Sequence, residues 1–201
     1  LLVAEYISDQ VNGDFIFSGG SYDPTNNSWA PIATTGAPAS GNPYQSPSQA
    51  IWAGSKMIVY GYVSDQVNGG FIFSGGSYDP AGDSWASITT TNAPAHDNLY
   101  QSPKAVWTGS KLLIYEYISD QVNGGSIFNG GSYDPAGDSW TTIPTVNAPA
   151  SPNNPSNGLP DPIWTGSKMI VYGVHFDGSN GTTSFSSSIY NPTGNSWAPI
   201  T

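Results

Sequence analysis

The 201-residue sequence contains no cysteine and no arginine, and its positive charge comes from only four lysines. Without cysteine the chain has no disulfide, no thiolate metal site and no cysteine nucleophile. The formal net charge of −10 argues against a nucleic-acid partner, because phosphate binding depends on basic side chains. The sequence also lacks a run of about eighteen apolar residues, so we expect no membrane insertion.

Residues suited to catalysis are scarce as well. The two histidines, His96 and His175, lie in different kinds of segment and have no repeated counterpart. No serine lies in a Gly-x-Ser-x-Gly elbow. The spacing of Asp79 and Asp83 fits the capping of a turn better than half a calcium site. We therefore predict no catalytic residue, no metal and no cofactor, although the many carboxylates keep a fragment of a larger enzyme as an alternative.

What the chain does contain is a repeat of 55 to 57 residues. The segment 75–85, Gly-Gly-Ser-Tyr-Asp-Pro-Ala-Gly-Asp-Ser-Trp, recurs with small changes from residues 19 and 130, and more loosely from 187. Two tryptophan series keep the same spacing, one at 29, 85, 140 and 197 and the other at 52, 107 and 164. Two markers with one period indicate one unit copied about four times. Because the tryptophans are periodic, we predict that they pack between repeats.

Each repeat contains four segments that are typical of β-strands. In the second repeat we predict strands at 48–52, 56–63, 70–78 and 84–89, each rich in β-branched or aromatic residues. The first and third links are tight, whereas the second link and the connection to the next repeat are long. In an up-and-down antiparallel sheet the long links share one end. We predict that binding occurs at this long-loop face.

Several motifs carry a resemblance to a known family. They are Ala-Val-Trp-Thr-Gly-Ser-Lys at 105–111, Met-Ile-Val-Tyr-Gly at 57–61 and 169–173, and the repeated Tyr-Asp-Pro and Trp elements. The sequence thereby resembles bacterial kelch-type repeats of the kelch and galactose-oxidase-like superfamily. This resemblance implies an all-β fold, a β-propeller or partial propeller of four-stranded antiparallel blades. The copper chemistry of some members needs a cysteine-modified tyrosine, so it does not carry over to a chain without cysteine.

We predict one repeat domain that covers residues 1–201. Its first blade, at 1–34, is incomplete because the first strand is absent, and three complete blades follow at 47–90, 102–145 and 160–201. Kelch rings usually have more blades than this. The resemblance therefore implies that the natural polypeptide is longer or that another copy closes the ring.

A polar loop, Tyr-(Ile/Val)-Ser-Asp-Gln-Val-Asn-Gly, occurs three times almost unchanged, at 6–13, 62–69 and 117–124. We predict that its tyrosines form stacking platforms for a sugar or peptide and that its polar side chains form hydrogen bonds. The candidate binding residues are Tyr6, Asp9, Gln10, Asn12, Tyr62, Asp65, Gln66, Asn68, Tyr117, Asp120, Gln121 and Asn123. The alternative is recent tandem duplication, in which Asp and Asn only form turns.

These observations favour a non-catalytic, extracellular or periplasmic propeller. We expect it to bind a protein partner or its own copies, through the long-loop face or an open blade edge, because an unpaired strand needs cover. A lectin that binds glycans at the repeated loops is the main alternative.

Overall fold

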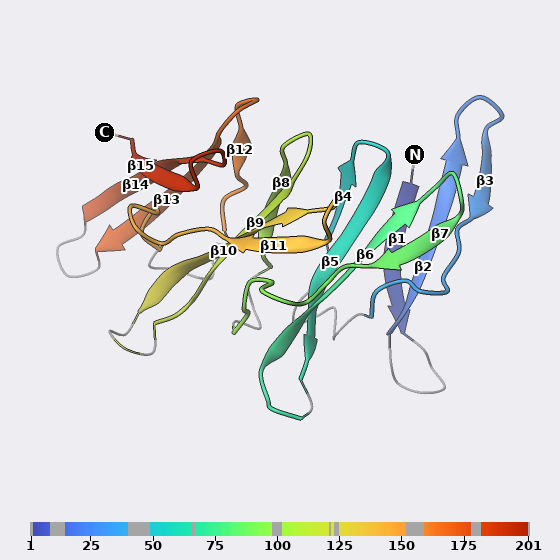
Figure 1. Cartoon of the computed structure of the whole chain (residues 1–201), viewed down its shortest axis with the longest axis horizontal. Coiled ribbons are helices and arrows are strands. Elements are labelled where there is room, and N and C mark those ends of the chain that lie inside the picture. Colours follow the sequence, from blue (N-terminus) through green and yellow to red (C-terminus); the bar gives the residue numbers. More distant parts are fainter. Residues whose placement is uncertain are drawn as a thin grey trace. The chain divides into compact units, whose positions relative to one another are not determined.

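The computed structural model describes residues 2–8, 15–39, 49–65, 67–97, 102–120, 122, 125–151, 159–177 and 182–200. The chain divides into two compact units, Leu1–Thr90 (unit 1) and Thr91–Thr201 (unit 2). Figure 1 shows that the regular structure of both is made of β-strands. In the described part of the chain, no helix is long and apolar enough to cross a membrane.

Unit 1 contains two antiparallel sheets. Sheet 1 has the order β1-β2-β3 and is made of β1 (Leu2–Ser8), β2 (Phe15–Asp23) and β3 (Ser28–Pro31). Sheet 2 has the order β4-β5-β6-β7 and is made of β4 (Gln49–Ala53), β5 (Lys56–Ser64), β6 (Phe71–Asp79) and β7 (Ser84–Ser87). Each strand pairs with its neighbour in sequence, so both sheets are up-and-down meanders.

Unit 2 contains two four-stranded sheets of the same kind. Sheet 3 is made of β8 (Lys104–Trp107), β9 (Leu112–Ser119), β10 (Ser126–Asp134) and β11 (Ser139–Thr142). Sheet 4 is made of β12 (Ile163–Trp164), β13 (Met169–Asp177), β14 (Thr182–Asn191) and β15 (Ser196–Pro199). The predicted fold class, all-β with propeller-type four-stranded blades, is confirmed.

The four strands predicted in the second repeat are confirmed, and each begins within one residue of its predicted start. The fourth strand is shorter than predicted, because β7 ends at Ser87. One further hydrogen bond, from the Ile88 N–H to the Gly75 carbonyl at 3.0 Å, follows it. Ile88 is buried, so the chain turns into the core where the predicted strand was to continue.

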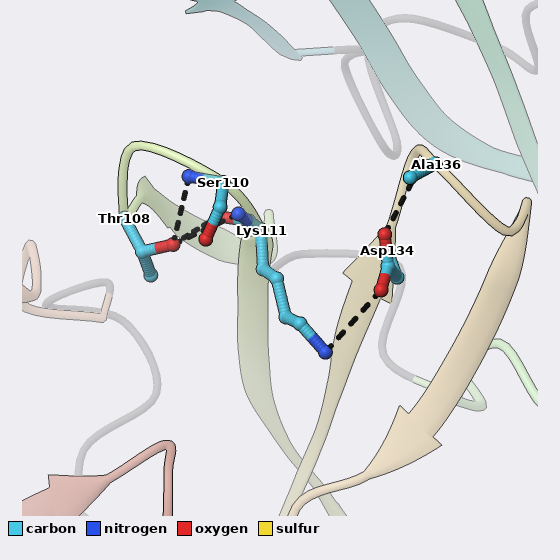
Figure 2. Close-up of polar contacts among 5 residues, drawn as sticks. All are labelled: Thr108, Ser110, Lys111, Asp134 and Ala136. Carbon is cyan, nitrogen blue, oxygen red and sulfur yellow. Dashed lines mark hydrogen bonds and ion pairs between the residues drawn. The ribbon is translucent and has the colours of Figure 1, made fainter.

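The two tight links of sheet 3 lie at one end of the sheet, as Figure 2 shows. In the β8–β9 link, the Thr108 hydroxyl accepts hydrogen bonds from the N–H groups of Lys111 (2.8 Å) and Ser110 (3.3 Å). The Lys111 Nζ lies 3.4 Å from Asp134 Oδ2. Asp134 begins the β10–β11 link, where its Oδ1 accepts from the Ala136 N–H at 3.0 Å. The ion pair therefore ties one tight turn to the other.

Sheet 2 has the same arrangement, with Lys56 Nζ 3.5 Å from Asp79 Oδ2. Because neighbouring strands run in opposite directions, the second link of each sheet and the link to the next sheet must lie at the opposite end. Within each of these two sheets, the predicted separation of tight links from long links is confirmed.

Sheets 1 and 2 pack face to face through aromatic and aliphatic side chains. The Trp85 ring of β7 meets the Phe17 ring of β2 edge to face, with centroids 4.9 Å apart and planes at 78°. Its indole N–H donates to the Ala33 carbonyl at 2.7 Å. The buried cluster around this contact consists of Phe17, Ile32, Met57, Val59 and Tyr78.

Sheets 3 and 4 repeat this packing in unit 2. The Trp197 ring meets the Phe128 ring edge to face, with centroids 5.1 Å apart and planes at 79°. Its indole N–H donates to the Pro144 carbonyl at 2.9 Å. The buried cluster is larger than in unit 1 and consists of Leu113, Tyr115, Tyr117, Phe128, Ile143, Leu159, Met169, Val171, Tyr190 and Trp197. Trp85 and Trp197 therefore have the predicted packing role.

Two other tryptophans, Trp29 and Trp52, do not pack between sheets. Trp29 is 58% exposed and Trp52 is 50% exposed. Trp29 pairs with Tyr22 across β2 and β3, so it lies on the face of sheet 1 opposite to Phe17 and away from sheet 2. Trp52 is on β4, the innermost strand of sheet 2, and the described strands of the neighbouring sheet 1 include none in the equivalent position. The prediction of packing between blades is wrong for these two residues.

Candidate functional site

The structure describes only part of the predicted polar loops. Asp9, Gln10, Asn12, Gln66, Gln121 and Asn123 lie outside the described residues. The described candidates are Tyr6, Tyr62, Asp65, Asn68, Tyr117 and Asp120.

The tyrosines of these loops take part in packing. Tyr62 and Tyr117 are only 2% and 3% exposed, and burial raises the pKa of the Tyr117 hydroxyl. The Tyr117 hydroxyl donates to the Pro149 carbonyl at 3.1 Å, and the half-buried Tyr6 donates to the Pro38 carbonyl at 2.8 Å. Both hydroxyls thus hold the segment that leads to the next sheet. Neither of the two buried rings is accessible for a sugar to stack on, which corrects the expected platform role.

Asp65 caps the turn that follows β5. Its Oδ1 accepts from the N–H groups of Val67 (2.9 Å) and Asn68 (3.0 Å), and its Oδ2 accepts from the Asn68 side chain at 3.0 Å. These bonds, the Asn68 side chain first, hold the pKa of the Asp65 carboxyl below its usual range. Gly69 and Gly70 complete the turn at φ 75° and 82°, a region that favours glycine. The carboxylate is therefore engaged within its own turn.

Asp120 forms the equivalent turn after β9. Its Oδ1 accepts from the Val122 N–H at 2.9 Å, and its own N–H donates to the Gly125 carbonyl at 3.0 Å. The Asp65 N–H makes the same bond to Gly70 at 2.9 Å. The described parts of these loops therefore favour the reading in which duplicated Asp and Asn residues form turns.

The acidic pair after β6 also forms a turn, as predicted. Asp79 Oδ1 accepts from the Ala81 N–H at 2.9 Å. Asp83 Oδ1 accepts from the Tyr78 hydroxyl at 2.6 Å and from the Ala33 N–H at 2.7 Å, which lowers the pKa of Asp83. Burial, together with this bond, raises the pKa of Tyr78 to about 12. In the described ranges no three His, Cys, Asp or Glu residues are grouped to hold a metal ion.

A buried polar pair in unit 2 was not predicted. His96 Nδ1 lies 2.6 Å from Glu116 Oε2, and both side chains are buried. At this distance the imidazole and the carboxyl group share a hydrogen bond. The one signal in the sequence is that this position holds a glutamate, Glu116, where two of the other repeats have Gly61 and Gly173; the first repeat has Glu5 there. Because the pair is buried, it does not face a substrate in solution.

Exposed apolar side chains gather on the face of sheet 1 turned away from sheet 2. We call this the sheet 1 outer face, and its members, with exposed fractions, are Val3 (45%), Ile7 (43%), Ile16 (48%) and Trp29 (58%). The equivalents of Val3 in sheets 2 and 4, Val59 and Val171, are 2% and 0% exposed. The same kind of face is therefore covered where another sheet lies against it.

A second set lies on the face of sheet 4 turned away from sheet 3. The members of this sheet 4 outer face are Ile163 (52%), Tyr172 (42%), Phe185 (80%) and Ile200 (44%). Their equivalents in sheet 3, in the same order, are Val106, Tyr115, Phe128 and Ile143, all of which belong to or pack against the buried cluster of unit 2. Contiguous exposed apolar side chains of this kind mark surfaces that bind other molecules.

Comparison with known proteins gives a limited result. No protein-family model matches the sequence, and no curated protein matches it. Among solved structures, the chain is similar to the "Structure of YjhT", with 12% identity and a TM-score of 0.49 over 92% of this chain and 59% of the other. It is also similar to the tricorn protease, with 10% identity and a TM-score of 0.38 over 97% of this chain and 22% of the other. The chain thus spans less than two thirds of the length of either protein.

Proposed function

We propose that this chain is a non-catalytic assembly module of kelch-type repeats, which binds further copies of itself through its two outer faces. The observation that carries the proposal is the exposure of Trp29 (58%) and Phe185 (80%). Each unit already contains one contact between the equivalents of these residues: Trp85 on Phe17 in unit 1, and Trp197 on Phe128 in unit 2. Trp29 of one copy against Phe185 of another repeats that edge-to-face contact.

The proposed contact joins two different faces, so it is heterologous. Such contacts either close into a ring or continue as a filament. A large aromatic side chain buries about 150–250 Å², and the apolar residues on each outer face add to that area. The net charge of −10 opposes association through mutual repulsion, which salt screens. Self-association should therefore increase with both protein concentration and ionic strength.

The test is the molar mass in solution, measured by light scattering over a wide range of protein and salt concentrations. We expect the mass of the wild-type protein to rise with concentration, and Trp29→Ala or Phe185→Ala alone to suppress the rise. A mixture of the two variants should form a mixed dimer, because Trp29→Ala keeps an intact Phe185 and Phe185→Ala keeps an intact Trp29. This complementation is specific to a heterologous contact.

The matched control is Val146→Ala. Val146 is 73% exposed but lies in the turn after β11, on neither outer face, so its replacement should leave association unchanged. A wild-type protein that stays monomeric throughout, or variants that associate as the wild type does, would refute the proposal. The first result would leave further blades of a longer polypeptide as the cover of these faces.

A further inference from the structure

An Asn-Gly pair lies in the exposed turn between β5 and β6. Both Asn68 and Gly69 are exposed, and Gly69 has a φ of 75°. A Cβ built at Gly69 would meet no atom within 4 Å, so the space around the turn is open. Asparagine is chemically labile, most of all before glycine, which has no Cβ to hinder the approach of its backbone nitrogen to the asparagine amide. The turn therefore combines a reactive dipeptide with access for water.

A second Asn-Gly pair of the described chain, Asn129-Gly130, lies within the ladder that joins β9 to β10. The Asn129 side chain donates to the Ala95 carbonyl at 2.7 Å. Gly130 is buried, and a Cβ there would lie 2.9 Å from the Ile114 carbonyl oxygen. For Gly130 to reach the Asn129 amide, the sheet would have to open locally. The same dipeptide is therefore protected in β10 and accessible in the β5–β6 turn.

An asparagine in the β2–β3 turn has the matching exposure without the glycine. Asn26 is exposed, and its Nδ2 donates to Asp23 Oδ2 at 2.7 Å. In the same way, Asn68 Nδ2 donates to Asp65 Oδ2 at 3.0 Å. The residue after Asn26 is Asn27, whose Cβ hinders the backbone nitrogen. The β5–β6 turn thus differs from one comparison site in exposure alone and from the other in the following glycine.

We propose that Asn68 is a site of spontaneous deamidation, by which the protein modifies its own β5–β6 turn. The Gly69 backbone nitrogen attacks Asn68 Cγ and forms a C–N bond. The Cγ–Nδ2 bond breaks, and ammonia leaves with the proton that the backbone nitrogen loses. One water molecule then hydrolyses the five-membered succinimide ring. Hydrolysis at one carbonyl gives aspartate, and hydrolysis at the other gives isoaspartate, in which the backbone continues through the side-chain carbon.

Neither product fits the turn as it stands. The Asn68 amide donates to Asp65 Oδ2, whereas a carboxylate in its place accepts only and repels the Asp65 carboxylate. Isoaspartate also lengthens the backbone before Gly69, whose N–H donates to the Asp65 carbonyl at 3.0 Å. Each event adds one negative charge to a chain with a net charge of −10. Deamidation should therefore open this turn at the long-loop end of sheet 2.

The test is incubation of the whole folded chain at mildly alkaline pH, followed by peptide mapping with mass spectrometry. We expect Asn68 to be converted at least about tenfold faster than Asn129, because opening an exposed turn costs less free energy than opening a sheet. Asn26 should stay intact for lack of the glycine. Chromatography should resolve aspartate and isoaspartate. Conversion at Asn68 that is absent, no faster than at the other two positions, or free of isoaspartate would overturn the proposal.

The same incubation in urea separates the effect of structure from that of local sequence. Unfolding exposes both Asn-Gly pairs, so Asn68 and Asn129 should then be converted at similar rates. Asn26 should remain slow, because the residue that follows it is unchanged. If Asn129 is still much slower than Asn68 in the unfolded chain, the folded turn does not select the site and the structural argument fails.

Asn68→Asp reproduces one product and tests the effect on the turn. Amide hydrogen exchange at Asp65 and Gly69 should become at least about tenfold faster in this variant, while exchange at Thr25 in the β2–β3 turn stays the same. The control is Asn92→Asp, which adds the same charge at an exposed position of another turn and should leave Asp65 unchanged. Unchanged protection of the turn in Asn68→Asp, or equal acceleration by both variants, would refute the opening of the turn by deamidation.

Discussion

The two units contain the same pair of packed sheets, but among the described strands only those of unit 2 include an innermost strand in the first sheet of the pair. In unit 2, β8 brings Val106 to the buried cluster, and Trp164 packs beside it. In unit 1, sheet 1 begins with β1, and Trp52, the equivalent of Trp164, is 50% exposed beside a cavity. A four-residue strand therefore decides whether this part of the interface between two sheets is closed.

The packing of the outer strands, unlike that of the innermost strands, is the same in the two units. Trp85 and Trp197 make nearly the same contact in both units, with centroids 4.9 and 5.1 Å from Phe17 and Phe128. This contact joins β2 to β7 in unit 1 and β10 to β15 in unit 2, so it does not involve an innermost strand. The aromatic contact is therefore the same in both units, whether or not an innermost strand is described beside it.

The largest expected loss of stability comes from removing the buried indole ring of Trp197, which contacts Phe128 in unit 2. Trp197→Ala should lower the free energy of unfolding by roughly 3–5 kcal/mol, as for other buried aromatic residues, because Trp197 is 5% exposed. Trp29→Ala should cost less than about 1 kcal/mol, because the exposed ring has little packing to lose. Urea denaturation of both variants measures the difference. Equal losses would show that burial does not separate the two positions.

A smaller loss of stability is expected when Val106 is truncated in unit 2. This truncation creates there the kind of cavity that adjoins Trp52 in unit 1. Val106→Ala removes two methyl groups that pack against the cluster and should cost roughly 1–2 kcal/mol. Val122→Ala is the control, since Val122 is 90% exposed and its truncation should change little. If Val106→Ala is as stable as the wild type, Val106 does not close this core and the comparison of the units fails.

Alkaline pH should destabilise both units through their hydrogen-bonded tyrosines. The pKa of Tyr78 in unit 1 and of Tyr190 in unit 2 is raised to about 12, mainly by burial. An unfolded tyrosine has a pKa of about 10. The stability that these groups contribute is therefore complete below pH 10 and is lost as the pH rises through 12. Because the hydrogen bonds of both hydroxyls are only partly buried, we expect no more than about 1–2 kcal/mol from each after solvent screening.

The measurement is the unfolding midpoint in urea between pH 9 and about 12, together with phenolate absorbance. Tyr190→Phe should flatten the pH dependence, because the ring stays and the titrating hydroxyl is removed. A variant with the same alkaline loss as the wild type would assign that loss to other groups.

The sequence was sufficient to predict most of the fold, because its signals are local. Strand limits follow from β-branched and aromatic runs between turn residues, and the Asp79 and Asp83 turn follows from Asx spacing. The requirement for glycine at the paired positions Gly75 and Gly76 of β6 has a physical explanation as well. A Cβ at Gly76 would lie 2.8 Å from Pro38 Cδ and 3.1 Å from Trp85 Cε3. Glycine is therefore needed where the ring and the linker close over β6.

The candidate sites depend on packing between sheets, which periodicity alone does not reveal. Repetition made all seven tryptophans look equivalent, yet Trp29 and Trp52 lack the neighbours that cover Trp197. The loop tyrosines looked like binding residues because they precede a polar segment, although Tyr117 turns inward to Pro149. Likewise, the pairing of His96 with Glu116 joins residues twenty positions apart in segments that no motif connects.

The smallest effect concerns equivalent turns that differ in charge. Tyr78 donates to Asp83 in sheet 2, whereas Tyr190 donates to Asn195 in sheet 4, both at 2.6 Å. The pKa of Asp83 is lowered, first by the Tyr78 bond. The stability it contributes is therefore present above its usual pKa of 3.8 and is lost as the pH falls further. Asn195 does not titrate, so acid should weaken the sheet 2 turn and spare its counterpart.

Asp83→Asn makes the sheet 2 turn resemble that of sheet 4. It should keep the tyrosine hydrogen bond through the amide oxygen and flatten the dependence of the melting temperature on pH below about 4. Hydrogen exchange at Ala33, whose N–H donates to Asp83 at 2.7 Å, reports locally on the same turn. Exchange there should accelerate in acid in the wild type but less so in the variant. If acid affects the two turns equally, Asp83 is not the group whose protonation distinguishes them, and the acid sensitivity of unit 1 must arise from another carboxylate.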